Sequence, residues 1–427
     1  MLAVERGELL RVEGGRELRG RVPMSGSKNA ALPVMAGCLL TSHPVRLTNV
    51  PALADTGRMA EIITALGASV AIGEDHTVVI RATDVHGTVP AELSRRMRGS
   101  IVLLGTLIAR VGEVRLPMPG GDAIGARRVG EHLRALRTMG AEIEELPAEL
   151  VARAPRGLRG ARVVLDLPTV TGTENIMLAA ATARGRTEIH NAAREPHVQD
   201  LARLLAAMGG RVEGAGSETI TVDGVPELGA AEHRVVSDYL EAGTYAFAVA
   251  AAGGDVTFTG CVPGDLDHAL AKLEQAGCGI ETGADWIRVR RDRERPLRAV
   301  DLVTWVHPRF PTDLQAQYLA LMTQADGQAL IQEWLYENRF QHVPELVRMG
   351  ADIQVNGRDA LVRGPSPLRA ADVRITDIRS GAALVIAALC AHGVSELDQA
   401  WHLDRGYEDM AGKLASLGAR VEQATAD

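Results

Sequence analysis

One short pattern recurs six times along the 427-residue chain: an apolar or small residue, a glycine, then a small residue. The six glycines are Gly67, Gly140, Gly209, Gly277, Gly350 and Gly418. They are 73, 69, 68, 73 and 68 residues apart. A nearly constant period over the whole chain predicts six copies of one structural unit.

The sequence around each glycine predicts what that unit is. Apolar residues recur at helical spacing before the glycine, as in residues 59–66, and a glycine just past a helix end adopts the left-handed conformation that stops the helix. Two alternating stretches joined by a turn follow, as in residues 69–82, which is typical of a β-hairpin. The sixth copy stops soon after residue 420. Residues 7–15 and 16–24 have strand patterns and are the candidates for its missing strands.

The repeats predict an α/β fold of two domains. Residues 28–236 would hold three repeats and a glycine-rich loop. Residues 237–427, together with 1–27, would hold the other three. The chain would then cross between the domains near residues 23–28 and 236–238, and we expect the active site in the cleft between two similar halves.

Composition excludes several classes of function. Lys+Arg 46 against Asp+Glu 54 gives a net charge of −8, and aromatics are only 3%, so we expect no nucleic-acid partner. The four cysteines are scattered, so neither a disulfide framework nor a metal site is expected. Long apolar runs are missing and the first six residues carry charges, so we expect no membrane partner, no signal peptide and a cytoplasmic location. Composition leaves the oligomeric state open.

Two glycine-containing segments are candidates for binding anions. Lys28 lies in a Ser-Gly-Ser-Lys-Asn segment at the first predicted crossing, where a cation suits a phosphate or carboxylate. Residues 119–128 combine three glycines with Asp122, Arg127 and Arg128, which suggests a mobile lid or an anion cradle. An ordinary turn and a long surface hairpin are the structural alternatives.

Other polar segments lie where a helix is expected to begin. Residues 307–313 form a proline-bracketed turn ending in Asp313, which suits a general base, although Thr312 or Asp313 could equally cap the helix that follows. Arginines adjoin carboxylates in residues 336–339, 376–379 and 403–407. Each alone resembles a surface ion pair, but equivalent positions in a repeat would gather them.

Taken together, these segments resemble the enolpyruvyl transferases, and most closely the branch that acts on UDP-N-acetylglucosamine. The matching stretches are SGSKNAALP, PGGDAIGAR, NAAREP, HPRFPTD, YENRF, DIR and HLDRGYE. The resemblance implies a two-domain inside-out α/β barrel and a reaction without a cofactor. In that reaction the enolpyruvyl group of phosphoenolpyruvate passes to a sugar hydroxyl of a uridine nucleotide, and phosphate leaves. The shikimate-phosphate branch usually has Lys-Ser where this chain has Lys28-Asn29, so it fits less well.

The resemblance also implies roles for individual residues. Asp122, Lys28, Asp313 and Arg405 would be catalytic, with Asp313 as the base beside the attacking hydroxyl. The residues expected to hold phosphoenolpyruvate are Lys28, Arg98, Arg127, Arg339, Asp377 and Arg405. The residues expected to hold the nucleotide sugar are Asn29, Arg98, Arg127, Arg128, Val129, Thr169, Val170, Asp313 and Leu335.

This chain departs from the usual family pattern at three places. Asp122 replaces a cysteine that fosfomycin alkylates, a variant found naturally in the family. Residues 128–131 read Arg-Val-Gly-Glu where Pro-Val-Asp normally contacts the uracil, and residues 237–239 read Ser-Asp-Tyr instead of Pro-Asp-Arg. The expected uridine site is therefore weakened while the phosphoenolpyruvate residues are intact.

Three functions remain open from the sequence. The acceptor is either the 3-hydroxyl of UDP-N-acetylglucosamine, as in peptidoglycan precursor synthesis, or the ribose hydroxyl of UMP, as in nucleoside-antibiotic pathways. A catalytically dead binding protein on the same scaffold is a third, against which the joint presence of Lys28, Asp313, Arg127, Arg339 and Arg405 argues.

Overall fold

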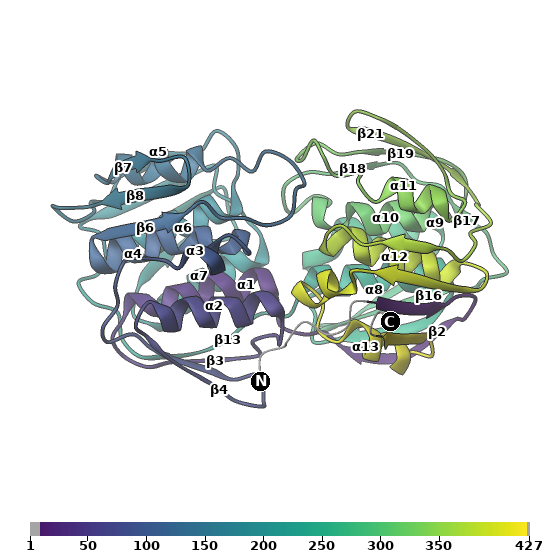
Figure 1. Cartoon of the computed structure of the whole chain (residues 1–427), viewed down its shortest axis with the longest axis horizontal. Coiled ribbons are helices and arrows are strands. Elements are labelled where there is room, and N and C mark those ends of the chain that lie inside the picture. The colour runs from purple at the N-terminus through teal and green to yellow at the C-terminus, as the bar shows by residue number, and fades with distance from the viewer. Residues whose placement is uncertain (1–8, 425–427) are drawn as a thin grey trace. The chain divides into compact units, whose positions relative to one another are not determined.

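The computed structural model describes residues 9–424, and their contacts divide the chain into two compact units. Unit 1 comprises Gly26–Asp122 and Arg127–Val236. Unit 2 comprises residues 9–25, Ala123–Ala126 and residues 237–424. Each unit has its own hydrophobic core, and Figure 1 labels the elements of both.

Three helices form the interior of each unit. In unit 1 they are α1 (Lys28–Gly37), α4 (Leu103–Val111) and α6 (Val170–Ala180), and in unit 2 they are α8 (Tyr239–Ala252), α10 (Gln315–Met322) and α12 (Ile378–Cys390). All fourteen residues of α8 are buried, as expected for a helix that is apolar on every side. The three helices of unit 2 pack against one another, and α4 packs against both of its companions in unit 1.

A second set of six helices carries the glycines of the repeat. They are α2 (Ala54–Ala65), α5 (Gly130–Thr138), α7 (Pro196–Ala207), α9 (Asp267–Ala276), α11 (Val343–Arg348) and α13 (Met410–Ser416). The glycine that ends each of them has a φ between +93° and +105°, so the predicted helix stop is confirmed at all six positions. Shorter helical segments are α3 (Ala91–Ser94), η1 (Cys38–Leu40), η2 (Arg98–Val102), η3 (Pro263–Leu266), η4 (Thr312–Leu314) and η5 (Ala400–Arg405).

The strands of unit 1 form three sheets, one for each repeat. Their orders are β13-β3-β5-β4, β6-β8-β7 and β11-β12-β10-β9. The strands are β3 (Val45–Thr48), β4 (Ser69–Ile72), β5 (Val78–Arg81), β6 (Glu113–Pro117), β7 (Glu142–Glu145), β8 (Glu149–Arg153), β9 (Arg162–Val164), β10 (Arg186–His190), β11 (Arg211–Glu213), β12 (Thr219–Asp223) and β13 (Ala231–Arg234).

Unit 2 likewise has three sheets. Their orders are β15-β16-β14-β2, β17-β19-β21-β20 with β18 beside β19, and β22-β23-β1-β24. The strands are β1 (Leu9–Glu13), β2 (Leu18–Pro23), β14 (Gly254–Thr259), β15 (Gly279–Thr282), β16 (Trp286–Arg291), β17 (Leu297–Arg298), β18 (Leu302–Val303), β19 (Ala325–Gln332), β20 (Asp352–Asn356), β21 (Asp359–Gly364), β22 (Asp372–Arg374), β23 (Val394–Asp398) and β24 (Arg420–Ala424).

The two N-terminal strands join different repeats. Strand β1 pairs antiparallel with β24, with Val12 opposite Val421, so it completes the sixth hairpin as predicted. Strand β2 instead pairs parallel with β14, which corrects the expectation that residues 16–24 also serve the sixth copy. The reason is a regularity of the repeat. The strand that follows each hairpin pairs in parallel with the first strand of the next copy, as β9 pairs with β10 and β22 pairs with β23. By the same rule, β2 closes unit 2 and β13 closes unit 1 by pairing with β3.

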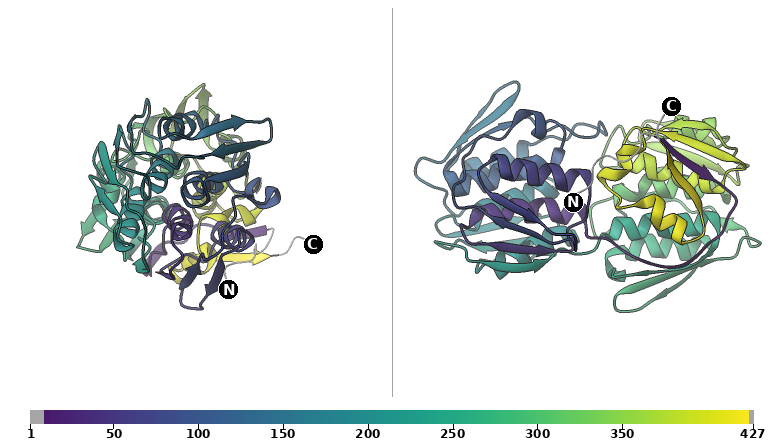
Figure 2. Two further views of the ribbon diagram at one scale, coloured as in Figure 1. Left: turned by 90° about the vertical axis from the view of Figure 1, so that its left-hand side faces the viewer. Right: turned by 60° about the horizontal axis from the view of Figure 1, so that its bottom comes forward.

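In each unit the helices lie inside and the sheets outside (Figures 1 and 2), the reverse of a conventional α/β barrel. The predicted inside-out arrangement of six helix and hairpin repeats is therefore confirmed. The interior helices begin at the loops that hold the polar segments described above: Lys28 opens α1, Asp313 precedes α10 and Asp377 precedes α12.

Close packing of two interior helices in unit 1 gives a test of this arrangement. A Cβ atom added at Gly105 of α4 would lie 2.2 Å from the backbone oxygen of Asn175 in α6. We expect Gly105→Ala to lower the free energy of unfolding by roughly 1–3 kcal/mol through overpacking. Urea unfolding followed by circular dichroism measures it, since all four tryptophans lie in unit 2.

The matched control is Gly130→Ala at the start of α5, where an added Cβ meets nothing within 4 Å. This change should leave stability equal or raise it by up to about 1 kcal/mol, because alanine restricts the unfolded chain more than glycine does. Equal effects of the two substitutions would contradict the close approach of α4 and α6.

Candidate functional site

Asp313 is held by two buried arginines of unit 2. Arg339 donates through Nη2 to Oδ1 at 2.7 Å, and Arg379 donates through Nη2 and Nε to Oδ2 at 3.1 and 3.3 Å. The arginines are 6% and 5% exposed, whereas the Asp313 side chain is 30% exposed and so remains open to a ligand. Pro311 and Leu314 occupy the cap positions of η4 and α10, so the interpretation of Thr312 or Asp313 as a helix cap is wrong.

A buried polar network holds the Nη1 side of Arg379, the part of the guanidinium that does not contact Asp313. Its Nη1 donates to the Tyr407 hydroxyl at 3.0 Å, and Gln317 donates to the same hydroxyl at 3.1 Å. Tyr407 also lies 3.0 Å from the hydroxyl of Thr244 on α8. Three elements far apart in sequence therefore orient one guanidinium, and an ordered guanidinium loses less freedom when it binds an anion.

The remaining predicted residues of unit 2 lie at neighbouring helix ends. Asp377 caps α12, because its Oδ1 accepts hydrogen bonds from the backbone N–H groups of Arg379 and Ser380. Arg405 ends η5 and is 6% exposed. The backbone N–H of Leu335 donates to Glu333 at 2.9 Å, just after β19.

Lys28 and Asn29 begin α1 in unit 1. The Lys28 ammonium lies 3.6 Å from a carboxylate oxygen of Asp55, and Arg58 donates to the other oxygen of that carboxylate at 3.1 Å. Two cations around one buried acid leave positive charge at the N-terminal end of α1, where the helix dipole also favours an anion. Sequence analysis missed Asp55, which occupies a helix start without any recognisable motif.

Arg98, Arg127 and the first part of the glycine-rich loop pack together in unit 1. Arg98 donates through Nη2 to the backbone oxygen of Arg127. A Cβ at Gly120 would lie 1.6 Å from the Arg95 carbonyl oxygen, and one at Gly121 would lie 2.9 Å from Nη2 of Arg127. The glycines are therefore needed for close contact with residues 95–98, and Asp122 follows them, half-buried.

The segment expected to meet the uracil surrounds the start of α5. Arg128 is exposed, and Val129 is the residue directly before α5. Thr169 caps α6 by accepting a hydrogen bond from the Gly172 N–H at 3.3 Å, and Val170 is the first residue of that helix. Glu131, the potential substitute for the missing aspartate, pairs with Arg134 and accepts from the backbone N–H of Asp166 at 3.1 Å.

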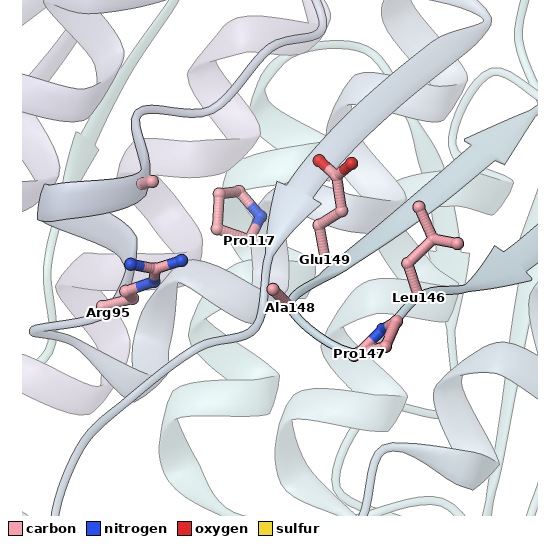
Figure 3. Close-up of a pocket in the computed structure, with 7 residues that line it drawn as sticks. Arg95, Pro117, Leu146, Pro147, Ala148 and Glu149 are labelled. Atoms are coloured by element: carbon pink, nitrogen blue, oxygen red, sulfur yellow. The ribbon is translucent and has the colours of Figure 1, made fainter.

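Other features lie outside these groups. A pocket of about 340 Å³ near the root of the glycine-rich loop (Figure 3) is lined mostly by apolar residues with Arg95 and Glu149, and it contains none of the predicted site residues. Within residues 9–424 there is no group of three acidic, histidine or cysteine side chains arranged for a metal, and no helix long and apolar enough to cross a membrane. All four cysteines are free thiols, three of them buried.

His132 of α5 is a buried histidine that sequence analysis also missed. It is 1% exposed, its Nε2 lies 2.9 Å from the Thr171 hydroxyl, and burial, aided by the charge of Arg98, lowers its pKa to about 3. The unfolded chain binds a proton here near pH 6.5, whereas the folded chain stays neutral until about pH 3. Because the unfolded chain binds a proton that the folded chain does not, the free energy of unfolding decreases progressively as the pH falls from about 6.5 towards 3.

We therefore expect His132→Gln to reduce the acid sensitivity of unit 1. Between pH 7 and pH 5 the variant should lose roughly 2 kcal/mol less unfolding free energy than the wild type, at about 1.4 kcal/mol per pH unit below 6.5. Urea unfolding at both pH values measures this. His43→Gln, at an exposed position of unit 1, is the control and should follow the wild type. Parallel pH profiles for wild type and His132→Gln would contradict this account.

Comparison with known proteins adds independent information. The family model described as EPSP synthase (3-phosphoshikimate 1-carboxyvinyltransferase) matches residues 12–414. A UDP-N-acetylglucosamine 1-carboxyvinyltransferase from Caulobacter sp. (strain K31) is 47% identical over 420 residues, covering 97% of each chain. One from Sorangium cellulosum (strain So ce56) is 49% identical over 417 residues, covering 97% of this chain and 98% of the relative. The crystal structure of the enolpyruvyl transferase NikO from Streptomyces tendae matches with a TM-score of 0.88 and 28% identity, over 99% of this chain and all of that one.

Proposed function

Because the chain belongs to the EPSP synthase family of enolpyruvyl transferases, we propose that it moves the enolpyruvyl group of phosphoenolpyruvate to the 3-hydroxyl of UDP-N-acetylglucosamine. The observation that carries the proposal is identity of 47% and 49%, over nearly the full length, to relatives named for that acceptor. The reaction would serve peptidoglycan precursor synthesis, in a cytoplasm whose reducing conditions suit four free thiols.

The proposed reaction makes three demands on the protein. The sugar oxygen bonds to C2 of phosphoenolpyruvate while its proton goes to a base, and C3 takes a proton from an acid. The tetrahedral intermediate then loses phosphate from C2 and a proton from C3, which restores the double bond. The protein must therefore supply a base, an acid and cations for a substrate that bears both phosphate and carboxylate.

The cations are available at ordered positions in both units. Lys28 at the start of α1, with Arg98 and Arg127, would serve from unit 1, and Arg339 and Arg405 from unit 2. Fixed cations stabilise developing negative charge more than water can, because they need no reorientation during the reaction. Asp377 would act mainly through α12, whose first turn it caps.

Two carboxylates would handle the protons. Asp313 is oriented by its ion pairs with Arg339 and Arg379, and its partial exposure leaves room for the sugar hydroxyl beside it. Asp122 follows the loop glycines and would deliver the proton to C3. Asn29 would help to hold the sugar from the first turn of α1.

The geometry near α5 favours considering UMP as a second candidate for the acceptor substrate. Glu131 accepts from Arg134 and from the backbone N–H of Asp166 through Oε2, so its Oε1 or the backbone groups of residues 128–130 would have to replace the usual hydrogen-bond acceptor for the uracil. If UMP were the acceptor, its ribose hydroxyl would lie beside Asp313 and this segment would have little to recognise.

An acceptor screen tests the function directly. We expect phosphate release from phosphoenolpyruvate with UDP-N-acetylglucosamine and none above background with UMP. Arg128→Pro combined with Gly130→Asp should raise kcat/KM for the UDP-sugar by a factor of about three to ten, as one restored hydrogen bond and an apolar face would. The KM for phosphoenolpyruvate should not change. Turnover with UMP and none with the UDP-sugar would overturn the proposal.

Asp122 gives a second prediction, on fosfomycin. A carboxylate is a far weaker nucleophile than a thiolate, so the wild type should not be inactivated, whereas Asp122→Cys should lose activity over time. Mass spectrometry should place the adduct on the introduced thiol. The native cysteines serve as the internal control, because burial raises the pKa of Cys261 and Cys278 to about 11. Time-dependent inactivation of the wild type would contradict the role given to Asp122.

A further inference from the structure

The glycine-rich loop is shared between the two units. Asp122 and Arg127 belong to unit 1, but Ala123–Ala126 between them belong to unit 2, where they contact the segment that follows β19. The chain therefore leaves unit 1 directly after the proposed proton donor and returns four residues later. The residues that hold these four loop residues therefore belong to the segment after β19, and they have no assigned part in the reaction.

Two side-chain amides meet at one carbonyl of the loop. Asn338 donates through Nδ2 to the Ala123 oxygen at 2.8 Å, and Gln341 donates through Nε2 to the same oxygen at 2.6 Å. The backbone N–H of Asn338 also donates to the oxygen of Ile124 at 3.2 Å. A carbonyl oxygen has two lone pairs, so the two amides saturate it.

Glu337 holds the other end of the same four residues. Its Oε1 accepts from the backbone N–H of Ala126 at 2.7 Å, while Arg358 lies 3.9 Å from its Oε2. A Cβ at Gly125 would lie 2.7 Å from that Oε2, so only glycine lets the carboxylate approach so closely. Ile124 between the two anchors is 8% exposed.

We propose that Glu337, Asn338 and Gln341 are positioning residues that hold the loop and thereby place the carboxylate of Asp122. The saturated carbonyl belongs to the residue directly after Asp122, so fixing it restricts the backbone on which that carboxylate is carried. Ordering these residues costs conformational entropy that hydrogen bonds and the burial of Ile124 offset. The role in proton transfer rests on the proposed function, whereas the anchorage does not.

The proposal separates these residues from the catalytic ones. Asn338 and Glu337 lie in the Tyr-Glu-Asn-Arg motif, where only Arg339 has a charge suited to the substrate. Removal of Asn338 or Gln341, the two anchors of Ala123, should lower the fraction of molecules with Asp122 in place. It should therefore reduce kcat while leaving the substrate-binding cations, and hence both KM values, nearly unchanged.

The first experiment measures loop anchorage without substrates. In an Asp122→Cys background, the rate of alkylation by iodoacetamide reports how freely residue 122 is reached, and the native thiols react slowly because burial raises their pKa. We expect Gln341→Met, which keeps the size but removes the donor, to speed alkylation about fivefold to tenfold, and Asn338→Ala to do the same. Gln328→Met, at an exposed position of β19, is the matched control and should not change the rate.

The second experiment measures turnover in the Asp122 background. Gln341→Met should lower kcat about fivefold to tenfold with both KM values within a factor of two, and Gln341→Lys, which keeps a donor of similar reach, should recover most of the loss. Unchanged alkylation would overturn the anchorage, and faster alkylation with unchanged kcat would overturn the placement of Asp122. Absence of turnover in the wild type with every acceptor would refute the proposed function instead, and the alkylation rates would still decide the anchorage.

Discussion

Two segments of chain at the boundary of the units, residues 25–27 and 236–238, are hydrogen-bonded to each other, and they directly follow the strands β2 and β13 that close the two rings of repeats. The Ser27 N–H donates to the Val236 oxygen at 2.7 Å, and the Asp238 N–H donates to the Ser25 oxygen at 2.8 Å. A buried carboxylate secures each side. Asp200 accepts from the Val236 N–H in unit 1, and Glu241 accepts from the Ser25 N–H in unit 2.

These carboxylates are costly to bury, which is why each has several partners. Burial raises the pKa of Glu241 to about 7, and Lys413, 2.6 Å away, opposes the shift. Asp200, fully buried, lies 3.2 Å from both Arg203 and His233. Loss of one partner from such a group generally costs about 3–5 kcal/mol, since the other charge is left buried and unpaired. The positions of Lys28, three residues past one crossing, and of α8, just past the other, depend on these anchors.

The repeat made much of the fold predictable from sequence. Glycines such as Gly67 and Gly277 mark helix ends through a local requirement, a positive φ that other residues adopt only with strain, and local requirements leave a signature in sequence. The sequence does not reveal the sheet to which β2 belongs, because its pattern shows that it is a strand without showing its partner. Parallel pairing with β14, more than two hundred residues away, follows from the closure of the ring and not from the residues of β2.

The site was predictable only in part, for a related reason. Asp313 and Arg339 stand in recognisable motifs, and they bond to each other at 2.7 Å. Arg379 stands in the sequence as one of several arginines beside acids, but its bond to Asp313 joins the start of α12 to η4, 66 residues away. Asp55 shows the same limit, since its contact with Lys28 is set by packing between α1 and α2 and leaves no spacing in the sequence.

The pairing of β1 with β23 and β24 has a consequence for how the chain is made. A ribosome synthesises the chain from the N-terminus to the C-terminus. All three repeats of unit 1 are therefore complete before the sixth repeat exists. Leu9–Glu13 must wait until residues 394–424 are made before both of its neighbours exist, with its backbone N–H and C=O groups unpaired until then. Contacts of such long sequence separation form slowly because the loop they close is large. Strand β24 thus completes a sheet whose central member, β1, is made long before it, and this sheet of unit 2 keeps an exposed edge until residues 420–424 are made.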